Sequence, residues 1–482
     1  MKRLIVSVFT ALIALAAAPA AAAPLTWEQI LPPMSNGQIN HRVNWVGPIE
    51  KAINGDLYAA VGLGDDPTTD DEDYEVIVYK STNFGRTWTE TDGQPFNSEI
   101  RVSGWEGVIF DIECSSTDAN ILYVTEGCDI YKSSNGGSRW VTLDNLFEEE
   151  ALDIEPEGLI VSIAIGYVGG TAYLFAATST FGNGRGGAFV LQESIFVSQW
   201  IDLEVATERE DTFGLIDVLA IDTLPDFSTS QGIVAVVCDY TQGMTFVTTR
   251  FMGGQWGEAA SDCILMYNTG SDQDFVDATL LDAVIWMPSD FSSDAESGNM
   301  VFFLGINPRD EEDIEQGDIF HCFFGAPEEG PVPAYDLDVR GNETGTAVSD
   351  VDGAGAWQDA DILISGYTND IAIPHTWATQ DGGLTWFQDA KRPTGGLSPL
   401  FPRALSSLRV HPDFATNGQA LVGTHGLDAG LSISYLPTDV CTTGFTWNTI
   451  YFISICTDRE AGDWLAPYGK RWFWDLLPEA DS

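Results

Sequence analysis

The stretch SSNGGSRW, residues 133–140, contains a turn signal that recurs twice elsewhere in the chain. STNFGRTW at 81–88 and TQDGGLTW at 379–386 show the same order of residue types. In each copy, Ser or Thr is followed at fixed spacing by Asn or Asp, then Gly, then Trp. Three copies far apart in one chain indicate a repeated structural unit.

The shared residues are those that a tight β-hairpin turn requires. Asn or Asp accepts backbone N–H bonds across a turn, Gly adopts a positive φ without a Cβ clash, and the hydroxyl group binds further backbone groups. Trp begins the return strand and buries its ring under the turn. We therefore predict structural turns with no catalytic role at Ser81, Asn83, Gly85, Trp88, Ser133, Asn135, Gly137, Trp140, Thr379, Asp381, Gly383 and Trp386.

Weaker markers extend the repeat along the chain. Further tryptophans follow at a similar spacing, and the segments 225–227, 288–291 and 412–414 each combine Pro, Asp and Phe between two apolar runs, which is typical of a strand–turn–strand connection. Units of this length with four short strands predict propeller blades. We expect an all-β fold, a single β-propeller of seven blades with four-stranded antiparallel sheets, at 42–92, 107–146, 157–205, 213–259, 278–345, 346–392 and 404–456.

These motifs resemble the Asp-box (BNR) repeat superfamily, which includes sialidases, xyloglucanases, sortilin-type receptors and photosystem II assembly-factor-like propellers. The resemblance implies a propeller in which the box marks the fold and identifies no activity. Sialidases share an Arg-Ile-Pro element before the first box, whereas Phe401-Pro402-Arg403 has Pro and Arg in the other order and follows the last box. The resemblance therefore implies a sialidase-like fold without sialidase motifs, and we assign no catalytic residue from it.

The N-terminus has the features of an export signal. Two basic residues precede an apolar run and small residues, so we expect a signal peptide at 1–22, a propeller at 23–460 and an aromatic-rich tail at 461–482. The chain carries 72 acidic and 21 basic residues, a net charge of −51. Such a surface repels phosphate backbones, so we expect no nucleic-acid partner. The mature protein should be secreted or at the cell surface, without stable membrane insertion.

Seven cysteines allow disulfides in an oxidising compartment. Cys114 and Cys128 flank one predicted hairpin, Cys441 and Cys456 flank another, and Cys238 and Cys263 could bridge neighbouring strands. Cys322 would then remain free.

No His, Cys or carboxylate spacing matches a metal motif, so we assign no metal ligand and no cofactor. The acidic runs at 65–73 and 310–313 do not fit an EF-hand, but they leave weak Ca²⁺ binding open.

Two classes of function fit these features. The missing catalytic signatures favour an exported, non-enzymatic binding or scaffold module that presents a ring face to a protein or a glycan of the cell envelope. The alternative is a secreted glycoside hydrolase-like enzyme that acts on a polysaccharide. Such an enzyme needs only two carboxylates at a suitable separation, and an acidic chain offers too many for the sequence to locate them.

Overall fold

The structure is a computed structural model that describes residues 34–451, except 36–37, 40–42, 64–74, 92–108, 144–145, 149–157, 183, 194–198, 206–214, 252, 259, 261, 269–272, 295–296, 325–330, 342–344, 369–370, 395–405, 426–428 and 437–443. The expected signal peptide and the aromatic tail lie outside the described residues.

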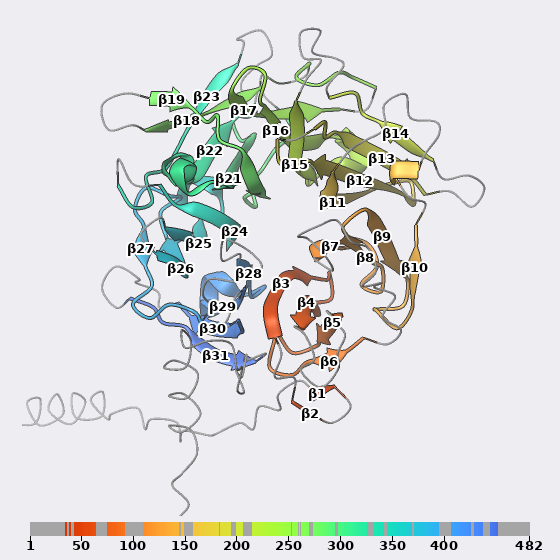
Figure 1. Ribbon diagram of the computed structural model, residues 1–482, viewed down its shortest axis with the longest axis vertical. Helices are drawn as coiled ribbons and strands as arrows, with labels where there is room; N and C mark the ends of the chain where they lie inside the picture. Colours follow the sequence, from red (N-terminus) through yellow and green to blue (C-terminus); the bar gives the residue numbers. More distant parts are fainter. Residues whose placement is uncertain are drawn as a thin grey trace, which may run out of the picture. The chain divides into compact units, whose positions relative to one another are not determined.

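Seven β-sheets surround a common axis and form a seven-bladed propeller (Figure 1), which confirms the predicted fold class. In five blades the four strands pair in chain order from the axis outward. Blade 1 contains β3 (Val43–Lys51), β4 (Leu57–Leu63), β5 (Glu75–Ser81) and β6 (Thr89–Glu90). Blade 2 contains β7 (Ile109–Cys114), β8 (Leu122–Glu126), β9 (Asp129–Ser133) and β10 (Trp140–Thr142). Blade 3 contains β11 (Leu159–Val168), β12 (Thr171–Ser179), β13 (Ala188–Gln192) and β14 (Trp200–Asp202).

Blades 6 and 7 complete the regular set. Blade 6 contains β24 (Ala347–Ala354), β25 (Asp361–Thr368), β26 (Ile371–Thr379) and β27 (Phe387–Gln388). Blade 7 contains β28 (Ser406–Val410), β29 (Gln419–Thr424), β30 (Leu431–Tyr435) and β31 (Asn448–Tyr451). Blade 1 and blade 7 exchange no strand among the described residues, so contacts between β3 and β28 close the ring. A short hairpin of β1 (Met34–Ser35) and β2 (Gln38–Ile39) forms a separate sheet.

Blades 4 and 5 depart from the regular pattern. Blade 4 contains β15 (Ile216–Thr223), β16 (Ile233–Asp239), β17 (Met244–Arg250), β18 (Cys263–Asn268) and an added β19 (Gln273–Phe275). Blade 5 has three consecutive strands, β20 (Leu280–Trp286), β21 (Val301–Pro308) and β22 (Ile319–Phe323). The next strand, β23 (Val332–Tyr335), pairs in parallel with β18 and therefore joins the two blades.

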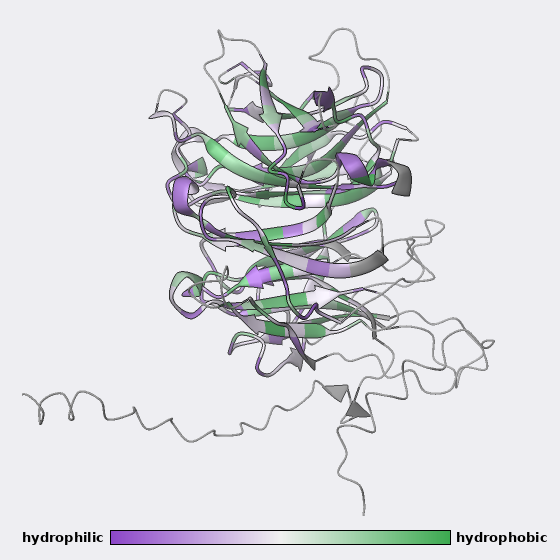
Figure 2. Cartoon of the chain, turned by 90° about the vertical axis from the view of Figure 1, so that its left-hand side faces the viewer, coloured by the Kyte–Doolittle hydropathy of each residue, from purple (hydrophilic) through white to green (hydrophobic). Residues whose placement is uncertain are grey.

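The core consists of apolar side chains packed between neighbouring sheets. Figure 2 shows that hydrophobic residues concentrate in the strands of the blades. All eight residues of β21 and all seven of β16 are buried, because each of these strands has a sheet on both of its faces. This arrangement removes a large apolar surface from water, which is the main source of stability in such a fold.

The three repeated turns share one hydrogen-bond pattern. In blade 2, Ser133 Oγ accepts from the Gly137 N–H at 2.9 Å and Asn135 Oδ1 accepts from the Arg139 N–H at 2.8 Å. The equivalent bonds are present in the other two copies, in which Ser81, Asn83, Thr379 and Asp381 are the acceptors. The fixed spacing in the sequence therefore reflects two side chains that bind the backbone of their own turn.

The tryptophan of each turn packs between its own blade and the preceding blade. Trp88 and Trp140 are buried at 5% and 6% exposure, whereas Trp386 is half-buried. Two of the three Pro-Asp-Phe connections contain a single helical turn, α2 (Phe227–Ser230) and α3 (Phe414–Asn417), between the first and second strands of their blades.

The described cysteines are free thiols, so the expected pairings of Cys114 with Cys128 and of Cys238 with Cys263 do not form in the structure. Cys114 pairs with the first residue of β8, whereas Cys128 follows the last residue of that strand, about 13 Å away. Cys238 and Cys263 are separated by β17, about 10 Å across the sheet. Both separations exceed the roughly 7 Å that a disulfide spans.

Cys322 is also free and fully buried. Cys441 and Cys456 lie outside the described residues, so their pairing stays a prediction. No helix among the described residues has both the length and the apolar character needed to cross a bilayer.

Candidate active site

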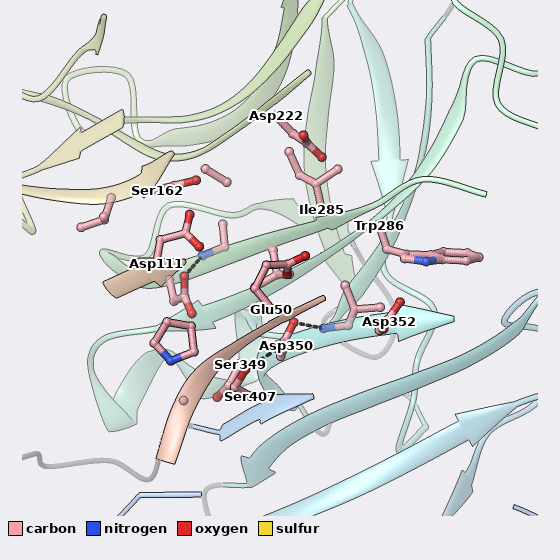
Figure 3. A pocket seen from close by; sticks show the side chains of 18 of the residues that line it. Glu50, Asp111, Ser162, Asp222, Ile285, Trp286, Ser349, Asp350, Asp352 and Ser407 are labelled. Carbon is pink, nitrogen blue, oxygen red and sulfur yellow. Dashed lines mark hydrogen bonds between the residues drawn. The ribbon is translucent and has the colours of Figure 1, made fainter. Parts of the chain in front are cut away.

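A cavity of about 420 Å³ lies at the propeller axis, where the first strands of the seven blades converge (Figure 3). This volume falls within the range of about 300–1,000 Å³ that is usual for small-molecule sites. Its wall contains seven carboxyl side chains from five blades: Glu50, Asp111, Glu113, Asp222, Asp282, Asp350 and Asp352.

Strand geometry explains why acids reach this cavity from mostly apolar strands. Alternate side chains of a strand point to the same face, so Asp111 and Glu113 of β7 point together, as do Asp350 and Asp352 of β24. A register shift in six of the seven first strands adds a bulge near the cavity, and bulges re-aim neighbouring side chains.

A first ring of polar side chains ties adjacent blades together. Asp111 Oδ2 accepts a hydrogen bond of 2.8 Å from the Ile163 N–H in the next blade. Asp350 Oδ2 accepts in the same way from the Leu408 N–H at 2.7 Å. Ser162 and Ser407 make the corresponding bonds to Ile221 and Ile49. These four side chains therefore link neighbouring blades through hydrogen bonds.

A second ring includes Glu50, Glu113, Asp222, Asp352 and Arg409. Three of these, Glu113, Asp352 and Arg409, lie two residues after a member of the first ring. The guanidinium of Arg409 donates through Nε and Nη2 to Glu50 Oε2, at 2.9 and 2.7 Å, and through Nη1 to Asp350 Oδ2 at 2.9 Å. Although burial opposes its charge, the carboxylates of Asp350 and Glu50 raise the pKa of Arg409. The cavity therefore holds a permanent cation that is already bonded to two anions.

Burial makes four further carboxyls of the cavity difficult to ionise. Burial raises the pKa of Asp111 and that of Asp222 to about 7. Burial, together with the carboxylates of Glu50, Asp222 and Asp111, raises the pKa of Glu113 well above its usual range. Burial also raises the pKa of Asp282. Protonated and ionised carboxyls therefore coexist in this cavity near neutral pH.

Hydrogen bonding distinguishes these carboxyls from one another. Asp352 Oδ2 accepts from the Val410 N–H at 2.8 Å, and Asp222 Oδ1 accepts from the N–H of the residue that follows it, Thr223. Among the residues that the structure describes, no hydrogen bond is recorded to the Glu113 carboxyl. Glu113 therefore faces the cavity without a fixed partner.

The rest of the wall adds an aromatic surface and a neutral imidazole. The half-buried Trp286 lines the cavity and packs against Phe303, with ring centroids 5.7 Å apart. Burial lowers the pKa of His425 to about 3, so this ring is uncharged at neutral pH. The cavity can thus hold a polar ligand that also offers an apolar face.

None of the predicted turn residues lines the cavity. The turn residues bind their own hairpins at the outer strands, whereas the cavity residues come from the first strand of each blade. The sequence analysis missed the cavity residues. The signal that could have found them is an alternation of acid, apolar residue and acid, seen in Asp111-Ile112-Glu113 and in Asp350-Val351-Asp352.

No described group of three or more His, Cys, Asp or Glu side chains has the geometry of a metal site. The acidic run 65–73 lies outside the described residues. The run 310–313 leads into a 3-10 helix, Glu311–Gln316. Weak Ca²⁺ binding by these runs stays a proposal.

Comparison with known proteins adds information on the fold. No family model matches the sequence, and no curated protein matches it. Among solved structures, a polysaccharide lyase of family 25, an ulvan lyase, is similar over 85% of this chain and 97% of its own, at 11% identity and a TM-score of 0.43. An α-L-arabinanase of Penicillium chrysogenum is similar over 87% and 99%, at 11% identity and a TM-score of 0.37. The Dos1 propeller is similar over 84% and 85%, at 9% identity and a TM-score of 0.43.

These results correct the expectation of a non-enzymatic scaffold. Several of the similar propellers are carbohydrate-processing enzymes, although likeness at this level shows the fold alone. The central cavity supplies the specific correction, because it gathers carboxyls with raised pKa values, a bonded arginine and a half-buried indole. Perturbed titration in a cavity is typical of catalytic sites, and the earlier absence of catalytic signatures reflected only the dispersal of these residues along the chain.

Proposed function

We propose that this protein is a glycoside hydrolase-like enzyme that cleaves a polysaccharide in the cavity at the propeller axis. The observation that carries the proposal is that Glu113 and Asp222, both half-buried, line the same cavity. After burial and Glu50, the Asp222 carboxylate is a further cause that raises the pKa of Glu113. Two carboxyls that repel each other lose their protons at different pH values. Most glycoside hydrolases need such a pair, one carboxyl to protonate the leaving oxygen and one carboxylate on the other side of the bond.

The remaining anions of the cavity support the same chemistry. The transition state of glycoside hydrolysis resembles an oxocarbenium ion and therefore carries positive charge on the sugar. Fixed carboxylates such as Asp350 and Asp352, already held by backbone N–H groups, stabilise that charge without moving.

The charge of the cavity also selects among substrates. The ionised members of the seven carboxyls repel a uronate or a sulfated sugar. The guanidinium of Arg409 in the wall is bonded to Glu50 and Asp350, and the ammonium of Lys51 donates to the Val410 carbonyl. We therefore propose a neutral or amino-containing polysaccharide as substrate. The indole of Trp286 offers an apolar surface against which the face of a sugar ring can pack.

The proposed site of action is outside the cytoplasm. The basic start, apolar run and small residues of 1–22 support export, and the substrate would be a glycan of the envelope or its surroundings. The three turns with identical hydrogen bonds support a relationship to the Asp-box superfamily. Fractionation of the native host, followed by detection of the mature chain, tests the localisation.

The activity is tested by incubating the purified full chain with neutral, amino-containing and uronic-acid polysaccharides and measuring new reducing ends. We expect activity on a member of the first two groups. Asp222→Asn should lower the rate at least about tenfold, because it removes one carboxylate of the pair while Oδ1 still accepts from Thr223. Asp413→Asn, at a carboxyl whose side chain is 75% exposed, is the matched control. Equal activity of the Asp222 variant and the control would locate the reaction elsewhere.

A further inference from the structure

We propose that Glu113 is the catalytic proton donor of the cavity, an assignment that rests on the proposed hydrolase function. It lines the cavity from the second ring, and among the described residues it is the carboxyl of this wall to which no hydrogen bond or ion pair is recorded. A proton donor must reach the leaving oxygen of its substrate. A side chain without a fixed bond is available for that contact.

The other acids of the wall are bound to the fold. Asp111 and Asp350 receive backbone N–H groups across the seams of the propeller, and Asp352 receives the N–H of Val410. Glu50 is bonded to Arg409 through two nitrogens. These bonds fix the four carboxyls in place, so they are less available than Glu113 for contact with a leaving oxygen.

Two aspartates have only one bond each, to the residue that follows them in the chain. Asp222 accepts from Thr223 and Asp282 accepts from Ala283. Glu113 differs from both because its side chain is one methylene longer and has no such bond. Burial, together with the carboxylates of Glu50, Asp222 and Asp111, raises the pKa of Glu113, while Arg409 opposes them, so the protonated form of this carboxyl is favoured.

The step balances with water as the only co-reactant. The Glu113 carboxyl proton passes to the glycosidic oxygen as the bond from that oxygen to the anomeric carbon breaks, and the bonding electron pair leaves with the oxygen. Water then adds its oxygen to the anomeric carbon, and the proton that it loses restores the Glu113 carboxyl. Asp222, as the anion, faces the positive charge that develops on the sugar.

The test compares Glu113→Gln with Glu315→Gln, a change of the same chemistry at an exposed glutamate. On the polysaccharide found in the screen, kcat of Glu113→Gln should fall by about 10²–10⁴-fold. On a dinitrophenyl glycoside of the same sugar, the loss should be below about tenfold, because that leaving group needs no proton. The alkaline limb of the kcat/KM profile should disappear in the variant and persist in the control.

The outcomes distinguish failure of the Glu113 assignment from failure of the hydrolase function. A polysaccharide rate that survives Glu113→Gln, or an equal loss on both substrates, would overturn the assignment and leave the hydrolase function standing. A parent protein that hydrolyses nothing would overturn the hydrolase function itself and the assignment with it. Thermal unfolding of both variants controls for folding, and Glu113→Gln should melt at or above the parent above pH 7, since it removes a carboxyl that burial penalises when charged.

Discussion

Arg409 Nη2 donates to Glu50 Oε2 at 2.7 Å, across 359 positions of the chain, and this ion pair joins the last blade to the first. Blades 1 and 7 share no strand among the described residues. Side chains therefore contribute to closure of the ring, beside an isolated backbone bridge between Trp45 and His425. The same ion pair forms part of the wall of the cavity. The ion pair that helps to close the propeller therefore also shapes the candidate site.

Removal of the arginine should weaken this closure. Arg409→Met leaves the Glu50 and Asp350 carboxylates without their cation, and a buried pair that loses one partner costs about 3 kcal/mol. Denaturant unfolding should show this loss at pH 7. Arg139→Met, at an exposed arginine whose backbone N–H alone binds the turn, is the control. A midpoint equal to that of the control would mean that packing alone closes the ring.

The tryptophan of the second turn should contribute strongly to stability. Trp140 is 6% exposed and packs in the cluster between blades 1 and 2. Trp140→Ala should cost about 3–5 kcal/mol, as expected for a large aromatic residue removed from a core. The neighbouring Val141 is 46% exposed, so Val141→Ala should change the unfolding midpoint little. A Trp140→Ala protein as stable as Val141→Ala would contradict the observed packing.

Stability should decrease as the pH rises from 4 to 8. Burial raises the pKa of Asp111 and of Asp222 to about 7 in the folded state, whereas an aspartate in an unfolded chain titrates near 3.9. Between these values the folded state binds more protons than the unfolded state, so the free energy of unfolding falls with pH. The contribution of these groups is fully present below about pH 4 and is lost through pH 7.

This decrease is measured by thermal melts across that range. Asp222→Asn removes one of the titrating groups and should flatten the slope, whereas the exposed Asp413→Asn should retain the parent slope. Parallel curves for the parent and Asp222→Asn would show that the ionisation of Asp222 is not penalised by folding.

The cysteines provide a test between the free thiols of the structure and the disulfides expected from the sequence. A non-reduced digest of exported protein should contain Cys114, Cys128, Cys238, Cys263 and Cys322 as unlinked peptides, because the first four lie too far from their expected partners. The pairing of Cys441 with Cys456 stays a prediction from the sequence. Mass spectrometry with a reduced control decides both, and a peptide that links Cys114 to Cys128 would contradict the strand register.

The predictable part of the fold lies in local interactions. The turn at Ser133, Asn135 and Gly137 is built by hydrogen bonds that each join residues within five positions of the chain. The turn can therefore be predicted from the sequence, and its recurrence together with the weaker markers predicts seven blades. Correct prediction of the cysteine pairs would have required the register between neighbouring strands. That register depends on which residues oppose each other across a sheet, and spacing along the chain does not determine it.

By itself, the sequence determined an all-β repeat fold and its blade-forming turns, because fixed local spacing of Gly, Asn or Asp, and Trp specifies hairpins independently of distant segments. Only the tertiary structure brought Glu50, Glu113, Asp222 and Arg409 to one cavity. Each of these residues belongs to a different blade, and each is one acid or base among many in the chain. Their proximity arises from closure of the ring, which turns side chains of the first strands toward the axis and partly removes them from water.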